Sequence, residues 1–197
     1  MKYRIAGIAA MVLVLLAVFL ADNVDTENPE KRVHQHLTAR QPDAGCDCDG
    51  TTLCTHLPLL VIDTGGVVIP GEPILNDQSE TIGYTTAADG NTMISATLSV
   101  MSNEEQNHHP TDTPDMESNI MIRIRGNSSR HFNKKSYRVK LVEDKEGLVN
   151  RDLPLLGMSK ENDWALYGPF LDKTLIRNYM WMNISAEIMG YAPEVRF

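Results

Sequence analysis

The sequence predicts an α+β fold that is rich in short strands and has one helix near its C-terminal end. Apolar and polar residues alternate over residues 92–101, 119–125 and 135–141, as in strands with one face in a core. Gly, Pro and Asn-Asp turns separate the strand-like runs of residues 58–101. Apolar residues recur at steps of three and four over residues 172–189, which predicts an amphipathic helix.

Residues 1–21 have the composition of an export signal. Lys2 and Arg4 precede a long uncharged apolar run, which matches the basic and hydrophobic regions of such signals. Phe19 stands where a cleavage site favours a small residue, so we expect a retained membrane anchor, with a cleaved signal peptide as the alternative. Because the basic end would stay inside, either alternative places the remainder outside the cytoplasm, anchored in the cell membrane or secreted to the cell surface.

Residues 22–57 are predicted to be a polar, acidic linker that contains all three cysteines of the chain. The cysteines are Cys46, Cys48 and Cys54. Outside the cytoplasm we expect one local disulfide and one remaining thiol. The alternatives are no role and, with His56, a metal site, although a Cys-x-Cys pair is short for one tetrahedral zinc ion. His108 and His109, in a polar loop further along, are expected to be surface residues.

The charge of the chain is unevenly distributed. The formal net charge is −8, from 18 basic and 26 acidic residues, yet seven basic residues and no acid lie between Met121 and Leu141. General nucleic-acid binding needs a broad basic face, so this distribution argues against it. It favours a single local site for an anion.

The basic stretch is predicted to be a hairpin with one core face and one cationic face, because isoleucines alternate with arginines in its first strand. Gly126 permits a positive φ, and the three small residues after it let backbone N–H groups converge on an anion. Arg125 and Arg130 flank this loop, and Lys134 and Lys135 follow it. The alternative is a solvated basic face that meets an acidic neighbouring segment, since the P-loop signature is absent from the sequence.

The segment Val61–Gly66 contains Asp63-Thr64-Gly65, the tripeptide found in the active-site turn of aspartic proteases. A protease of this kind needs a second aspartate from another chain and a supporting apolar-apolar-Gly segment, for which residues 81–83 are a poor candidate. We therefore interpret the segment as a strand that ends in a turn. An aspartic protease remains a distant alternative.

Near the C-terminal end, Asp172 is expected to cap the predicted helix and Gly190 to end it. Residues 191–197 are expected to begin another strand. Because a domain seldom ends where a core strand starts, we expect the chain to be part of a longer domain. Asp163, just before the short strand around Trp164, is expected to lie in a turn.

Four segments together resemble the CotH family of spore-coat-type atypical protein kinases. They are IRIRGNSS, KKSYRVKL, DWALYGPFLDKTLIRNYMWMNIS and MGYAPEVRF, in the order and at the spacing of that family. The resemblance implies that residues 118–197 are the N-terminal part of a kinase-like domain, preceded by a β-rich module over residues 58–117. It also implies phosphoryl transfer from ATP and Mg²⁺ to serines of a protein substrate. The family's metal-binding and catalytic aspartates lie further on, so we expect no catalytic residue in this chain.

In such a kinase the hairpin loop would cover the phosphates of ATP, Lys140 or Arg138 would neutralise them, and the C-terminal helix would brace the lobe. A non-catalytic cell-surface binding or adhesion protein, or a structural protein of the spore coat, is the alternative. The residues expected to contact ATP are Arg125, Gly126, Asn127, Ser128, Ser129, Lys135, Arg138 and Lys140.

Overall fold

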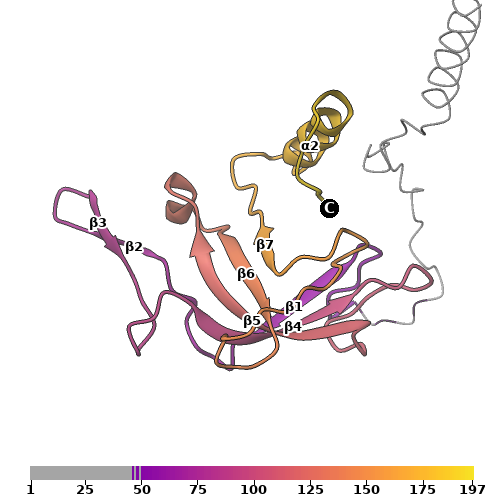
Figure 1. The fold of residues 1–197 in the computed structure, drawn as a ribbon, viewed down its shortest axis with the longest axis horizontal. Coiled ribbons are helices and arrows are strands. Elements are labelled where there is room, and N and C mark those ends of the chain that lie inside the picture. The colour runs from indigo at the N-terminus through magenta and orange to yellow at the C-terminus, as the bar shows by residue number, and fades with distance from the viewer. Residues whose placement is uncertain (1–45, 47, 49) are drawn as a thin grey trace, which may run out of the picture.

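The computed structural model describes residues 46, 48 and 50–197, which form an α+β, strand-rich structure, as predicted (Figure 1). Five antiparallel strands form the main sheet in the order β1-β4-β5-β6-β7, and β2 pairs with β3 in a separate hairpin. The helical elements of the described residues are the short 3-10 helix η1 (Ser128–His131) and α2 (Arg177–Ile188). The strands are β1 (Leu59–Asp63), β2 (Pro73–Leu75), β3 (Thr81–Tyr84), β4 (Ile94–Met101), β5 (Met116–Arg125), β6 (Ser136–Val142) and β7 (Asp163–Leu166).

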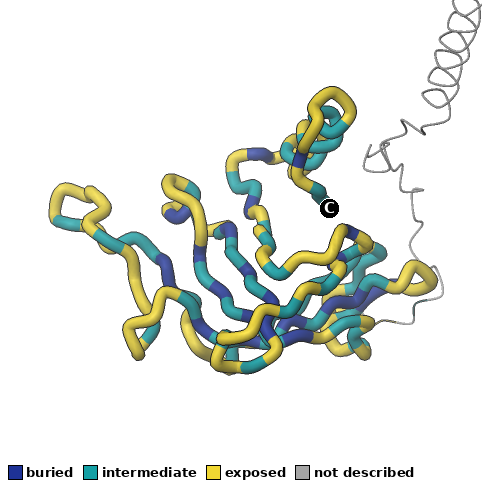
Figure 2. Tube along the Cα trace, viewed as in Figure 1, coloured by how far each residue is buried: buried dark blue, intermediate teal, exposed yellow. Residues whose placement is uncertain are grey.

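The core lies on one face of the main sheet. Every second residue of β4 and β5 is buried, which Figure 2 shows as alternating colours along the strands. Ile122 lies opposite Ile94 on one side and Val139 on the other, so the apolar rows of three strands form a continuous surface. Leu155 and Met158, from the segment between β6 and β7, pack against this surface. The predicted alternation is confirmed.

The main sheet extends across the boundary predicted between residues 117 and 118. That boundary falls inside β5, and β4 pairs with both β1 and β5. Residues 58–117 and 118–197 therefore contribute strands to the same sheet. The segment 1–21 lies outside the described residues, as does most of the linker 22–57. Within the described part of the chain, no helix combines the length and the apolar character needed to cross a membrane.

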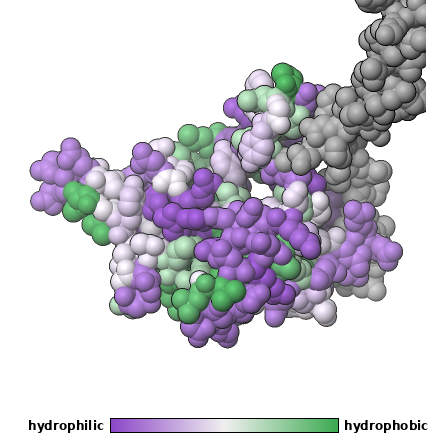
Figure 3. Space-filling model, viewed as in Figure 1, coloured by the Kyte–Doolittle hydropathy of each residue, from purple (hydrophilic) through white to green (hydrophobic). Residues whose placement is uncertain are grey.

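The C-terminal helix begins later than predicted. Leu175 has a φ of 64°, a left-handed value that an α-helix does not contain, and α2 begins two residues further on, at Arg177. Asp172 instead organises the turn before the helix, because its carboxylate accepts hydrogen bonds from the N–H groups of Thr174 (3.0 Å) and Arg177 (2.9 Å). No residue of α2 is buried, and the helix lies beyond the end of β7 with hydrophobic surface exposed (Figures 1 and 3).

The end of α2 also differs from the prediction. Gly190 does not have the positive φ of a helix-terminating glycine; the helix ends at Ile188, and Met189 after it is in an extended conformation. Residues 191–197 form no strand. They run back to the segment between β6 and β7, where Glu194 accepts a hydrogen bond from the N–H of Ser159 (2.6 Å). A polar contact with that segment replaces the expected strand pairing.

Candidate phosphate-binding site

β5 and β6 form the predicted hairpin, and its register defines a basic surface. Arg123 lies opposite Arg138, and directly opposite residues of antiparallel strands project from the same side of a sheet. The isoleucines of β5 occupy the core side, so these two arginines project from the other side, together with Arg125 and Lys140. We call Arg123, Arg125, Arg138 and Lys140 the cationic face. β7 adds Asp163, directly opposite Lys140.

The loop after β5 has the geometry expected of a small-residue turn. Gly126 has a φ of 107°, and a Cβ atom there would lie only 1.9 Å from the hydroxyl oxygen of Ser129. That hydroxyl donates a hydrogen bond to the carbonyl oxygen of Arg125 (3.5 Å). Asn127 and Ser128 are exposed. Within the described residues, the backbone N–H groups of residues 127–129 have no hydrogen-bond partner, so they are available to a ligand.

Arg130 fixes this loop to the segment that leads into the β2–β3 hairpin. Its side chain is buried, with Nε donating to the carbonyl oxygen of Gly126 (2.6 Å) and Nη1 to that of Gly71 (2.8 Å). The guanidinium also lies 4.0 Å from the centre of the Tyr84 ring. Although Arg130 flanks the loop in the sequence, two of its nitrogen atoms donate to carbonyl groups of the protein. It holds the loop in position.

Lys135 also connects the loop to the preceding segment. Its ammonium nitrogen lies 2.7 Å from a carboxylate oxygen of Glu72 and donates to the carbonyl oxygen of Arg130 (2.5 Å). The side chain of Lys135 is only 15% exposed. This ion pair is an example of the alternative given in the sequence analysis, in which the basic stretch meets an acidic neighbouring segment. Lys135, one of the predicted ATP contacts, is therefore already bonded to other groups of the protein.

Arg138 is paired with an acid on the next strand. Its Nε donates to one carboxylate oxygen of Asp163 (2.8 Å), and its Nη2 donates to the other. Asp163 is the first residue of β7, so its expected position in a turn is wrong: it belongs to the ladder with β6. The hydrogen bond from Arg138 lowers the pKa of Asp163, and the charges of Lys140 and Arg123 add to this. One acid thus offsets part of the positive charge of this face.

The remaining members of the cationic face are open to a ligand. In the part of the chain that the structure describes, the side chains of Arg123, Arg125 and Lys140 form no hydrogen bond or ion pair. Arg125 is exposed, and Arg123 and Lys140 are partly exposed. Like the N–H groups of residues 127–129, these side chains offer only hydrogen-bond donors. Such a set suits an anion with several oxygen atoms.

Asp63 is placed as a turn residue. It ends β1 and is exposed, and its carboxylate accepts a hydrogen bond from the N–H of Gly65 (2.8 Å). Gly65 and Gly66 follow with positive φ values of 60° and 80°. Residues 81–83, the poor candidate for a supporting segment, belong to β3 in the separate hairpin. These observations support the interpretation of the Asp-Thr-Gly tripeptide as the end of a strand.

A second polar cluster lies at another edge of the sheet. The ligand atoms of Cys46, Cys48, Cys54 and His109 all lie within 4.8 Å of one another, and none of the cysteines is in a disulfide. Burial raises the pKa of the Cys54 thiol to about 11, whereas the hydrogen bond with Cys46 lowers that of Cys48. His108 and His109 are not surface residues: His108 is fully buried and His109 is partly buried. No spacing pattern in the sequence connects His109 to the cysteines.

The fold and this surface define a strand-rich α+β domain with a basic hairpin suited to anions. Residues 122–197 match the sequence model of the CotH family, described as CotH kinase protein, which confirms the resemblance over that part of the chain. The matched region begins within β5 and includes the loop, β6, β7 and α2. Neither the curated proteins nor the solved structures give a match to the chain.

Proposed function

We propose that the cationic face and the loop of residues 126–129 hold the phosphates of ATP in a CotH-type protein kinase. The observation that carries this proposal is the position of Arg125 and Lys140. Both are free of ion pairs within the described residues, and they project from the same side of a hairpin whose loop has unpaired N–H groups. The match of residues 122–197 to the CotH kinase protein family supports the choice of ATP as the anion.

The predicted contact residues differ in what they can contribute. Arg125 offers a planar fork of donors, and Lys140 a compact charge, so both suit phosphate oxygens without first breaking a contact. Arg138 would have to share its guanidinium with Asp163, and Lys135 its ammonium group with Glu72. We therefore assign direct contacts to Arg125, Lys140 and the backbone of the loop. Lys135 and Arg138 would position and balance them.

ATP would supply the phosphoryl group, and the residues described here would bind and orient the phosphates. Mg²⁺ prefers carboxylate oxygens, but Asp163, the acid of this surface, is engaged by Arg138. The resemblance implies that the family's metal-binding aspartates come after this region. We propose that the main sheet and α2 belong to the N-terminal lobe of a kinase-like domain, that the acceptor is a serine of another protein, and that residues 1–21 tether the domain outside the cytoplasm.

Calorimetric titration of the purified chain with ATP and Mg²⁺ tests the binding step. Replacing Arg125 or Lys140 with alanine removes one charge-assisted contact of about 1.5–3 kcal/mol, so each variant should bind ATP about ten- to a hundredfold more weakly. Lys160→Ala is the matched control, because Lys160 is exposed and follows the segment that covers the apolar face of the sheet. If Arg125→Ala and Lys140→Ala bind ATP as the wild type does while remaining folded, the proposal is wrong.

Incubation with γ-labelled ATP and a serine-containing protein tests the transfer step. We expect no labelled product from residues 1–197, because the aspartates that the resemblance implies have no counterpart in this sequence. If a protein that does carry those aspartates also binds ATP without transferring the phosphoryl group, this result would favour the non-catalytic alternative.

A further inference from the structure

The cysteine cluster has the dimensions of a tetrahedral metal site. The sulfur atoms of Cys46 and Cys54 are 3.7 Å apart, and the sulfur of Cys46 is 3.4 Å from Nε2 of His109. In a tetrahedron with Zn–S of about 2.3 Å and Zn–N of about 2.0–2.1 Å, the corresponding edges are ~3.8 Å and ~3.5 Å. The sulfur of Cys48 lies within 4.8 Å of the other three ligand atoms. Three sulfurs and one nitrogen thus lie close enough together to be ligands of one metal ion.

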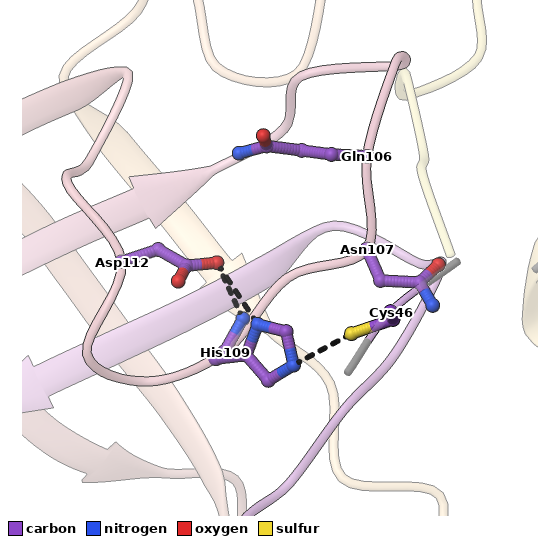
Figure 4. Close-up of a pocket in the computed structure, with 5 residues that line it drawn as sticks. All are labelled: Cys46, Gln106, Asn107, His109 and Asp112. Atoms are coloured by element: carbon purple, nitrogen blue, oxygen red, sulfur yellow. Dashed lines mark hydrogen bonds and ion pairs between the residues drawn. The ribbon is translucent and has the colours of Figure 1, made fainter. Parts of the chain in front are cut away.

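The histidine of the cluster is oriented by an acid. Nδ1 of His109 is 3.3 Å from a carboxylate oxygen of Asp112, and the same oxygen accepts a hydrogen bond from the backbone N–H of His109 (2.7 Å). The other ring nitrogen therefore points to the cysteines, as Figure 4 shows for Cys46. A carboxylate behind a histidine is a common arrangement in metal sites, where it fixes the tautomer of the ring. Asn107 also donates to the sulfur of Cys54 (3.5 Å).

The backbone brings these residues together in the fold itself. Thr55 and His108 exchange two main-chain hydrogen bonds, of 3.1 Å and 2.7 Å. The buried ring of His108 lies between the carbonyl oxygens of Leu57 (2.8 Å) and Asn103 (2.9 Å). These contacts hold the chain just after Cys54 against the loop between β4 and β5. His109 can thus reach Cys46 although 63 positions separate them.

We propose that Cys46, Cys48, Cys54 and His109 bind one Zn²⁺ ion, which fastens the segment before β1 to the loop between β4 and β5. Thiolate and imidazole ligands in a tetrahedron favour zinc, and four protein ligands leave no open position, so the site is structural. A disulfide would use two of the three thiols and would give the pairing of His109 with Asp112 no role. The zinc site is independent of ATP binding, because it lies outside the cationic face and its loop.

The test is the metal content of the full chain, purified under reducing conditions without metal-affinity steps. We expect about one zinc ion per chain by plasma mass spectrometry, and a cobalt-substituted chain with the absorption bands of tetrahedral thiolate coordination. Cys48→Ser and His109→Ala should each lose the metal. His56→Ala is the matched control and should keep it, because His56 lies close in sequence but outside the group of four. Asp112→Asn should bind zinc about 10- to 100-fold more weakly.

Two results would overturn the proposal. One is a folded wild-type chain that binds neither Zn²⁺ nor Co²⁺ although its three thiols are reduced. The other is a chain in which His56→Ala abolishes metal binding and His109→Ala does not. Because the cobalt spectrum and the metal content are measured on the wild type, they decide the matter even if the cysteine variants do not fold. Alkylation of the thiols before and after chelation makes the same distinction without any substitution. Thiols that bind a metal should react only after chelation, whereas thiols joined in a disulfide should react in neither case.

Discussion

Arg130→Ala is expected to destabilise the protein by about 3 kcal/mol, because this side chain joins the loop to the segment before β2. The substitution removes two hydrogen bonds from a charged, buried donor, each worth about 1.5–3 kcal/mol. It also removes the contact with the ring of Tyr84, worth about 0.5–1 kcal/mol at a partly exposed site. Water can reach the freed carbonyl groups once the loop relaxes, so the total should fall below the sum of the parts.

Two further variants separate the contributions. Arg130→Lys keeps the charge but not the fork, so it should retain one of the two carbonyl contacts and lose about half as much stability. Tyr84→Leu should cost about 0.5–1 kcal/mol alone and almost nothing in the Arg130→Ala background, because the ring contact is already lost there.

Urea unfolding measures these differences when it is followed by tryptophan fluorescence, to which Trp164 contributes from its position against the core. The urea dependence of the unfolding free energy should stay the same in all variants, since the area exposed on unfolding hardly changes. A value for Arg130→Ala within about 0.5 kcal/mol of wild type, the range of ordinary surface changes, would refute the assigned role of Arg130.

Three other outcomes are expected. Gly126→Val should weaken ATP binding about ten- to a hundredfold and lower the stability by about 1–3 kcal/mol, because valine does not tolerate a φ of 107°. Calorimetry measures the affinity and urea unfolding the stability, and an unchanged affinity would contradict the role of the loop. Asp63→Asn should leave ATP affinity and stability unchanged, since the amide oxygen can still accept the turn hydrogen bond; a marked loss of affinity in the same titration would argue against a turn role. Asp163 has a lowered pKa in the folded protein, so its pairing with Arg138 should stabilise the fold above about pH 4 and be lost as the pH falls through that lowered value. Unfolding measured between about pH 5 and 2 should show a shallower acid dependence in Arg138→Leu, and an identical dependence would exclude this pair as its source.

The sheet could be predicted from the sequence because alternation reports directly on a one-sided strand. Ile120, Ile122 and Ile124 are all buried, whereas Arg123 and Arg125, which alternate with the last two, are not. The same rule predicted the cationic face, and with it the position of Arg125 and Lys140. Alternation carries no information about partners from other strands, so the pairing of Arg138 with Asp163 and of Lys135 with Glu72 could not be predicted.

Other differences from the sequence prediction have causes that side-chain patterns do not report. Leu175 continues the apolar repeat of a helix, but its left-handed φ delays the start of α2, and a repeat of side chains does not report on backbone angles. The position of His109 beside Cys46 depends on long-range pairing between residues 55 and 108. Spacing rules for metal sites apply to neighbours in sequence, so the metal alternative considered from the sequence named His56, which does not belong to the cluster.

The exposure of α2 has a consequence for how the protein unfolds locally. Trp181 is 61% exposed and Ile188 is 81% exposed, so little apolar burial opposes the loss of this helix. An isolated helix of 12 residues is marginal in water, whereas the strands of the main sheet share one core. The amide hydrogens of α2 should therefore exchange with solvent through local fraying, at rates independent of the global unfolding free energy. Those of β5 and β6 should exchange only when the whole sheet unfolds, which divides the described chain into two regions of unequal cooperativity.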